Sequence, residues 1–235
     1  ILLALFTVII GFVLGIVLAI MRMTDIRPLR FLAYGKNGRI RNSKTLIAIS
    51  KFNPVSFLAT AYVEILRSTP VIVQIMIIYH GVFGKLIDLP NFTLFGFLKF
   101  NRFFPGVVAL GMNSGAYLCE IIRSGIQSID GGQTEAARSL GMTKTQTLVH
   151  IILPQAIKNM IPSIVNQFII TLKDTSILSV IGFPELVNKA QNVIAITFKS
   201  FEMWAIVAVM YLVVILALQQ VANALERRLR RDQKK

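Results

Sequence analysis

The chain has few charges and a single cysteine. Only 15% of its 235 residues are charged, whereas soluble domains usually carry about a quarter. Cys119 stands alone, which excludes a disulfide within the chain and a metal site built from several cysteines. His80 and His150 lack the spacing of metal ligands, and no nucleophile has a base at a suitable spacing. We therefore predict no metal site and no catalytic residue.

The phosphate-binding pattern G-x-x-x-x-G-K-[ST] is also missing from the sequence. The chain is therefore predicted to bind no nucleotide or other cofactor and to be no enzyme. Any energy from ATP must come from a separate protein.

Long apolar runs dominate what is present. Hydrophobic residues make up 54% of the chain, and its mean hydropathy is +0.67. Residues 1–21 hold no charge, and about 20 such residues cross a bilayer as a helix. We therefore predict an all-α integral membrane protein with one domain over residues 1–235 and about five transmembrane helices. The expected spans lie near residues 1–22, 55–83, 104–128, 155–173 and 200–225.

Prolines interrupt two of these spans. Pro70 and the length of the second span predict that this span is either bent or tilted. Pro162 is tolerated in the fourth span where neighbours satisfy the freed carbonyl group. The first span lacks the basic start and the cleavage pattern of a secretory signal. Because the chain begins at Ile1 inside apolar sequence, we expect the natural polypeptide to extend upstream.

The basic residues predict the orientation. The net charge of +14 would suggest nucleic acid in a soluble protein, but in a membrane protein it indicates cytoplasmic loops and anionic lipid. Residues 22–51 hold eight basic residues and one acidic residue, and the tail 226–235 holds six basic residues. Four predicted spans separate these regions, so both lie on one side. We expect residues 22–54, 129–154 and the C-terminus inside, the N-terminus outside, and no nucleic-acid partner. The turn-rich segment 34–44 is consistent with a polar loop or with an amphipathic piece on the lipid surface.

The stretch EAARSLGMTKTQTLVHIILP, residues 135–154, predicts a helix, a turn and a second helix. Residues 133–140 favour a helix, and Gly141 fits the left-handed position that ends one. Thr143 and Gln146 match a capping box, and Pro154 suits the first turn of the next span. The unit is consistent with a docking surface for a cytoplasmic partner or with a loop that only caps the span ends.

This stretch resembles the EAA loop of bacterial ATP-binding-cassette (ABC) importer permeases. Their pattern of E-A-A, a glycine after three residues, and I-x-L-P about nine residues later is matched at residues 135–137, 141 and 151–154. Segments 61–74, 115–142 and 153–182 resemble those of the polar amino-acid permeases of the histidine/glutamine type, although Ile177 replaces a common leucine.

The resemblance implies a type I ABC importer-like permease in the bacterial cytoplasmic membrane, with a coupling loop at residues 131–154. Such a permease moves polar amino acids like glutamine, glutamate, arginine or histidine by alternating access. The implied partners are cytoplasmic ATPase subunits that bind ATP and Mg, a second identical or related permease subunit, and an external substrate-binding protein or fused receptor domain. The residues implied in ATPase coupling are Glu135, Ala136, Ala137, Arg138, Leu140 and Gly141.

Two Glu-x-x-Arg patterns fall within predicted spans, where charged groups are costly and often functional. Glu64 and Arg67, like Glu120 and Arg123, stand three residues apart on one helical face and are expected to pair near the cytoplasmic rim. They are candidates either for anchors of helix ends or for a link to the cytoplasmic gate.

Other polar residues in the spans are candidates for the substrate pathway, since an amino acid needs a few donors and acceptors amid apolar walls. The alternative is hydrogen bonding between helices. The patterns Gly11-x-x-x-Gly15 and Gly111-x-x-x-Gly115 predict close helix packing. The pathway candidates are Asn113, Ser114, Tyr117, Asn166, Gln167, Lys173 and Asp174.

Two other functions are compatible with a membrane protein of this composition. An ion-driven secondary transporter needs no ATPase, and many such folds carry internal repeats, of which this sequence has only the six-residue echo VEILRS and CEIIRS. A membrane scaffold or signalling subunit that transports nothing is the other alternative.

Overall fold

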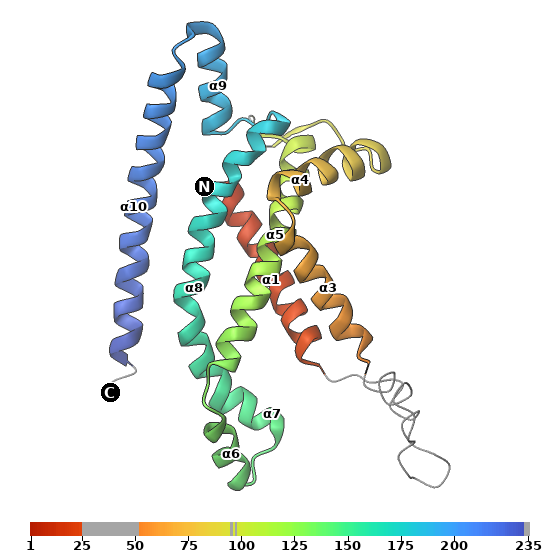
Figure 1. Ribbon diagram of the computed structural model, residues 1–235, viewed down its shortest axis with the longest axis vertical. Helices are drawn as coiled ribbons and strands as arrows, with labels where there is room; N and C mark the ends of the chain where they lie inside the picture. Colours follow the sequence, from red (N-terminus) through yellow and green to blue (C-terminus); the bar gives the residue numbers. More distant parts are fainter. Residues whose placement is uncertain (25–51, 95, 97, 233–235) are drawn as a thin grey trace.

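A computed structural model describes residues 1–24, 52–94, 96 and 98–232. The predicted basic segment 25–51, including the turn-rich residues 34–44, lies outside the described residues. Long helices make up most of the described chain and run side by side (Figure 1). They are α1 (Leu2–Met23), α3 (Pro54–Ser68), α5 (Phe100–Gln127), α8 (Leu153–Asp174) and α10 (Ser200–Asp232).

Shorter elements connect these helices. Two of them are π-helical, η2 and η3, and one is a 3-10 helix, η4. Strands β1 and β2 form a small antiparallel hairpin. The connecting elements are α4 (Val71–Met76), η2 (Ile77–Leu86), β1 (Thr93–Leu94), β2 (Leu98–Lys99), α6 (Gly131–Ser139), α7 (Lys144–Thr147), η3 (Leu148–Ile152), η4 (Thr175–Ile181) and α9 (Leu186–Thr197).

Three described helical stretches are long and apolar enough to cross a membrane: Leu2–Met23, Lys144–Ile181 and Ser200–Arg227. A fourth consists of α3 with α4 and η2, if this bent pair counts as one span. The central helix α5 is also long, with 28 residues, but it carries the polar and charged candidates of the predicted third span. The prediction of an all-α membrane protein is confirmed.

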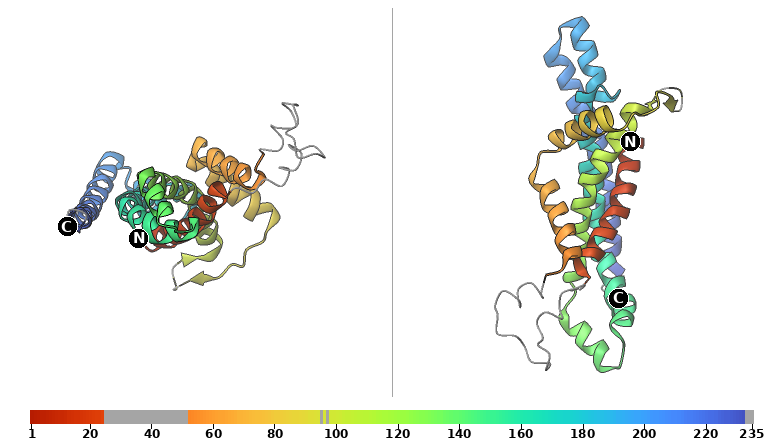
Figure 2. Two further views of the ribbon diagram at one scale, coloured as in Figure 1. Left: turned by 90° about the horizontal axis from the view of Figure 1, so that it is seen from below. Right: turned by 90° about the vertical axis from the view of Figure 1, so that its right-hand side faces the viewer.

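The second span is bent at Pro70, which is one of the two predicted alternatives, and the bend measures 110°. Thr69 adopts extended backbone angles between α3 and α4, as expected for a residue that precedes proline. Pro70 then caps the start of α4. The second predicted span is therefore a broken helix whose two halves run in very different directions, which Figure 2 shows from two further sides.

Glycines let α1 and α5 approach closely. A Cβ added to Gly15 would lie 2.8 Å from the Cβ of Leu118, and one added to Gly115 would lie 2.9 Å from Leu14. Gly11 faces Ser114 in the same way. The prediction that both G-x-x-x-G patterns are packing faces is confirmed, and the two faces pack against each other.

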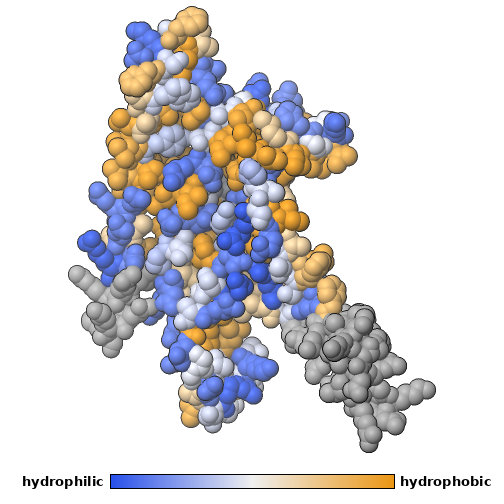
Figure 3. All heavy atoms as spheres, viewed as in Figure 1, coloured by the Kyte–Doolittle hydropathy of each residue, from blue (hydrophilic) through white to orange (hydrophobic). Residues whose placement is uncertain are grey.

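Helix α5 also joins the two hydrophobic cores. One core packs the first half of α5 against α4, η2 and η4, and the other packs its second half against α1, α3 and α8. Many large apolar side chains on α1 and α10 remain exposed, as expected for surfaces that meet lipid. In Figure 3, hydrophilic residues gather on the lower lobe formed by α6 and α7, and hydrophobic residues gather over α4.

The turn between α9 and α10 lies at the end of the molecule opposite α6 and α7 (Figure 1). Glu185 caps α9, where its carboxylate accepts hydrogen bonds from the backbone N–H groups of Val187 at 2.8 Å and Asn188 at 2.6 Å. Burial raises the pKa of the Glu185 carboxyl, although these two hydrogen bonds oppose the shift. Phe198 ends α9 in the left-handed conformation, which allows the chain to reverse into α10.

Candidate functional site

The α6–α7 unit, residues 131–147, projects from one end of the helix bundle (Figures 1 and 2). Asp130 caps α6 by accepting a hydrogen bond of 2.7 Å from the Gly132 N–H group. The C-terminal end of α1 and the N-terminal end of α8 lie at the same end of the bundle as α6 and α7 (Figure 1). The unit is thus held on rigid helices and stands clear of them.

Gly141 ends α6 in the left-handed conformation, with φ at +83°. The N–H group of Met142 donates to the Ala137 carbonyl at 3.2 Å, and that of Gly141 donates to the Arg138 carbonyl at 3.0 Å. These two bonds define a Schellman motif, which satisfies the carbonyls left free at a helix end. The Arg138 guanidinium adds a bond of 2.7 Å to the Met142 carbonyl. The predicted role of Gly141 as a helix-ending residue is confirmed.

The second helix begins as predicted. Thr143 accepts a hydrogen bond from the Gln146 N–H group at 3.2 Å, and the Gln146 side chain accepts one from the Thr143 N–H group at 2.8 Å. This reciprocal capping box is confirmed. Pro154 lies in the first turn of α8. Helix α7 is thus the beginning of the long Lys144–Ile181 stretch, which continues through η3 into α8.

The coupling candidates divide into one inward residue and an exposed surface. Ala137 is the buried residue of α6, whereas Glu135, Ala136 and Arg138 on the same helix are exposed. Leu140 is 84% exposed beside the turn.

Glu120 lies at the centre of a cluster of three arginines, which we call the Glu120 cluster. Its Oε2 atom accepts hydrogen bonds from Arg123 at 2.9 and 3.1 Å, and its Oε1 atom accepts one from Arg22. Arg67 completes the cluster at 3.7 Å from Oε1. The Glu120 side chain is only 17% exposed. The predicted Glu120–Arg123 pair is confirmed, and the cluster also joins α5 to the ends of α1 and α3.

The predicted Glu64–Arg67 pair is wrong. Arg67 turns instead to Glu120 and lies over the ring of Tyr117, 5.4 Å from its centre, while Glu64 is exposed. Both residues lie in the last two turns of α3, and Arg67 is about 20 Å along that helix from Pro54. The pair was therefore also misplaced at the rim where the second span begins. Sequence spacing on one helix cannot reveal that a carboxylate on another helix attracts the arginine more strongly.

Asn113 and Gln74 form a clamp at the break between α3 and α4. The Gln74 side-chain amide donates to the carbonyls of Leu66 at 2.7 Å and Thr69 at 3.1 Å, and to the Thr69 hydroxyl at 2.8 Å. Asn113 donates to the Gln74 side chain at 3.0 Å. A broken helix leaves carbonyls without partners, and in an apolar setting each one must be satisfied. Gln74 was not among the residues predicted from the sequence, although a glutamine four residues after Pro70 in an otherwise apolar stretch was a usable signal.

The other pathway candidates do not gather at one site. Ser114 is buried against Gly11 of α1, and Gln167 is buried with Thr171 as its neighbour at 3.5 Å. Asn166 and Lys173 are exposed, and Asp174 is half-buried at the end of α8. Among the described residues, no hydrogen bond joins the α5 candidates to the α8 candidates.

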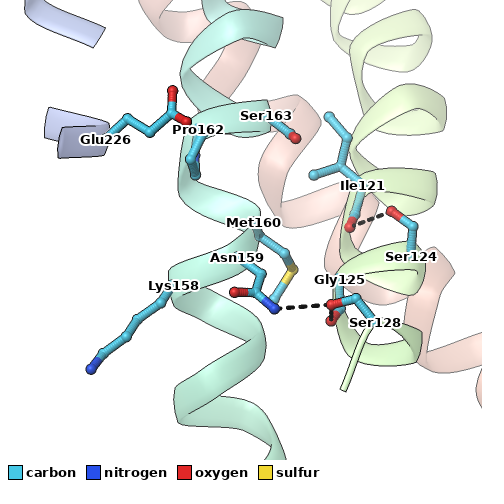
Figure 4. A pocket seen from close by; sticks show the side chains of 10 residues that line it. All are labelled: Ile121, Ser124, Gly125, Ser128, Lys158, Asn159, Met160, Pro162, Ser163 and Glu226. Carbon is cyan, nitrogen blue, oxygen red and sulfur yellow. Dashed lines mark hydrogen bonds between the residues drawn. The ribbon is translucent and has the colours of Figure 1, made fainter. Parts of the chain in front are cut away.

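A polar cavity of about 480 Å³ lies between α5 and α8, with Glu226 of α10 at its edge (Figure 4). Ser124 donates to the Ile121 carbonyl at 3.1 Å, and Asn159 donates to the Ser128 hydroxyl at 3.0 Å. Figure 4 shows the second bond bridging the two helices. These residues were not predicted from the sequence, because single serines and asparagines near span ends form no recognisable pattern.

Residues 45–231 match the family described as the binding-protein-dependent transport system inner membrane component. The chain belongs to this family. It is therefore a permease component of such a transport system, as the resemblance in the EAA loop implies.

Members of this family from several bacteria are similar in sequence. The glutamine transport system permease protein GlnP of Escherichia coli (strain K12) is 40% identical over 172 residues, which cover 73% of this chain and 74% of GlnP. The arginine transport system permease protein ArtQ of Bacillus subtilis (strain 168) is 39% identical over 186 residues, which cover 79% of this chain and 80% of ArtQ.

Solved structures agree with the fold. The crystal structure of an amino acid ABC transporter with histidines matches with a TM-score of 0.77 at 36% identity, covering 96% of this chain and 88% of that one. The inward-facing MetNI methionine ABC transporter matches with a TM-score of 0.62 at 18% identity, covering 96% and 94%. The permease has the fold of type I ABC importer permeases.

Proposed function

We propose that this permease is the transmembrane subunit of an ATP-driven importer that moves polar amino acids into the cell. Relatives named for glutamine and arginine transport support the substrate class. The observation that carries the mechanism is the α6–α7 unit, whose Schellman turn at Gly141 places the exposed Leu140 beyond the helix bundle. This surface is where a cytoplasmic ATPase subunit docks.

The orientation follows from the distribution of charge. Basic residues outnumber acidic ones eight to one in residues 22–51, and basic loops stay in the cytoplasm. The end of α1, the start of α3 and α6 all lie at one end of the bundle (Figure 1). We therefore place the α6–α7 unit and the C-terminus inside the cell and the N-terminus outside.

Movement of the ATPase is passed on through two long helices. Asp130 and Gly131 follow α5 closely, and α7 continues through η3 into α8. A shift of the α6–α7 unit therefore displaces the cytoplasmic ends of both α5 and α8. Glu120 lies on α5 seven residues before Gln127. Its contacts with Arg22 and Arg67 link that displacement to α1 and α3. These contacts support a role for Glu120 in the cytoplasmic gate.

The substrate pathway is proposed to pass Arg67 and Tyr117. Arg67 is the most distant of the three arginines from Glu120 and keeps 38% of its side chain exposed, so its guanidinium has donors left for a carboxylate. Tyr117 remains partly exposed beneath it. Asn113, by contrast, acts through the clamp that holds the helix break.

The complete importer needs further components. ATP and Mg bind to the ATPase partner, because this sequence has no phosphate-binding loop of the usual pattern. A second permease subunit, identical or related, completes the pathway, and an external binding protein or a fused receptor domain delivers the amino acid.

Uptake into vesicles tests this function against its two alternatives. The permease is reconstituted with its ATPase and binding protein, and uptake is measured with ATP alone and with an ion gradient alone. We expect transport only with ATP. Transport that persists without ATP and collapses with the ion gradient would refute the proposal in favour of a secondary transporter. Sustained ATP hydrolysis without any substrate movement would indicate a scaffold or signalling subunit.

A further inference from the structure

A deep apolar groove lies between α1, α5 and the start of α8. Its volume is about 640 Å³, within the range of pockets that bind small molecules. Thr24 is the one polar residue among the described residues that line it, and it follows the last residue of α1. The groove therefore runs along the apolar helices and reaches the point where α1 ends. Its exposed walls include Ile20, Ile157 and Leu148.

A second, basic pocket continues this groove toward the α6–α7 unit. Its volume is about 360 Å³, and it shares Ile126 and Leu148 with the apolar groove. Arg138 and Lys144 contribute two positive charges, and Thr134 and Thr147 contribute hydroxyl groups. None of the described residues that line it is acidic. The combined surface thus changes from almost entirely apolar to basic across the shared residues Ile126 and Leu148.

We propose that this continuous groove binds one anionic phospholipid, with an acyl chain between α1, α5 and α8 and the phosphate at Arg138 and Lys144. The change of chemistry along the groove matches that of the lipid, because the acyl chain is apolar and the phosphate is negative and accepts hydrogen bonds. Arg138 uses one guanidinium nitrogen for the Met142 carbonyl, which leaves further N–H groups for a phosphate.

Charge complementarity favours this occupant over a helix from a second copy of the chain. Such a helix would have to bring acidic side chains to the basic pocket, and the whole sequence has only 11 acidic residues. A phospholipid in the adjacent leaflet supplies the negative charge and the apolar chain together. The bound lipid would lie against α6 and α7 and so would support the position of the proposed docking surface.

Lipid binding is tested in vesicles by fluorescence, independently of transport. The chain has a single tryptophan, Trp204 on α10. In a Trp204→Phe background, Ile157→Trp places the reporter on the groove wall. Quenching by phosphatidylglycerol with brominated acyl chains is compared with quenching by brominated phosphatidylcholine. We expect the anionic lipid to bind preferentially, by roughly fivefold for each basic side chain that it contacts.

Matched variants and salt separate a specific site from general lipid contact. Lys144→Gln should reduce the preference by roughly fivefold, and high salt should reduce it in the reporter protein without any further substitution. Lys158→Gln, which removes a charge from the polar cavity between α5 and α8, should leave the preference unchanged. The native Trp204 reporter should show no preference, since Trp204 on α10 is not among the described residues that line either the groove or the basic pocket.

Three results would overturn the proposal. The first is equal quenching by both lipids at the Ile157→Trp reporter. The second is a preference for the anionic lipid that neither Lys144→Gln nor high salt reduces. The third is quenching by neither lipid combined with cross-linking of this face to a second copy of the chain, which would mean that the groove is a subunit interface.

Discussion

Replacing Gly141 by valine should loosen the α6–α7 unit without creating any steric clash. The backbone at Gly141 has a φ of +83°, and no heavy atom of the described part of the chain lies within 4 Å of an added Cβ. The cost therefore comes from the backbone alone. It is about 1–2 kcal/mol for an ordinary L-residue in the left-handed region and larger for a β-branched one. A cost of this size changes a local equilibrium roughly 5- to 30-fold.

The substitutions at Gly141 should follow a definite order. Asparagine tolerates the left-handed conformation best, alanine should cost more, and valine should cost the most. Gly131→Ala is the matched control, because Gly131 is in the same unit, has an ordinary φ and has open space around it. The amide of Met142 reports the turn directly, since it bonds to the Ala137 carbonyl only when the turn is closed.

Two measurements check this order. Hydrogen exchange at Met142 should accelerate from glycine through asparagine and alanine to valine, and the amino acid imported per ATP hydrolysed should fall in the same order. Gly131→Ala should change neither quantity. If Gly141→Val left both exchange and coupling at their wild-type values, the turn would not position the docking surface and our reasoning would be refuted.

Four further substitutions test other parts of the structure. Glu120→Gln should weaken the contacts with its three arginines and impair coupling while leaving assembly intact; wild-type transport in this variant would show that the cluster plays no part in gating. Replacing Gln74 or Asn113 by leucine should lower the thermal stability of the purified protein, by about 1–3 kcal/mol for each buried polar group left without a partner, and a variant as stable as wild type would argue against the clamp. Gly15→Ala should destabilise the contact between α1 and α5 by about 1–3 kcal/mol through overpacking. Gly81→Ala is the control, because no atom of the described residues lies within 4 Å of its added Cβ, and it should retain full helix packing.

Local features of the chain were predictable from sequence because each depends on neighbouring residues. The left-handed turn at Gly141 and the capping box of Thr143 and Gln146 were identified correctly, since the backbone angles and hydrogen bonds they need involve residues within one turn. A bend at Pro70 was one of the two predicted alternatives for the same reason, although its size of 110° was not predicted. The apolar runs predicted the membrane helices because lipid leaves few other options.

Contacts between distant helices were not predictable in the same way. Spacing alone paired Glu64 with Arg67, but the fold brings Arg67 to Glu120 on α5. Asn113 was selected as a pathway residue because it is polar within a span, and the structure gives it a hydrogen-bonding partner at the helix break instead. In both cases the deciding partner lies on another helix, and only the three-dimensional arrangement identifies it.

Accumulation of labelled amino acids in vesicles tests the central claim most directly. The vesicles contain the permease with its ATPase and external binding protein, carry no ion gradient, and are supplied with ATP on the side of the α6–α7 unit. We predict that one or more polar amino acids accumulate above their concentration on the opposite side, and that accumulation stops when ATP is removed. If no amino acid in a panel of glutamine, glutamate, arginine and histidine accumulates while ATP is hydrolysed, the account is contradicted.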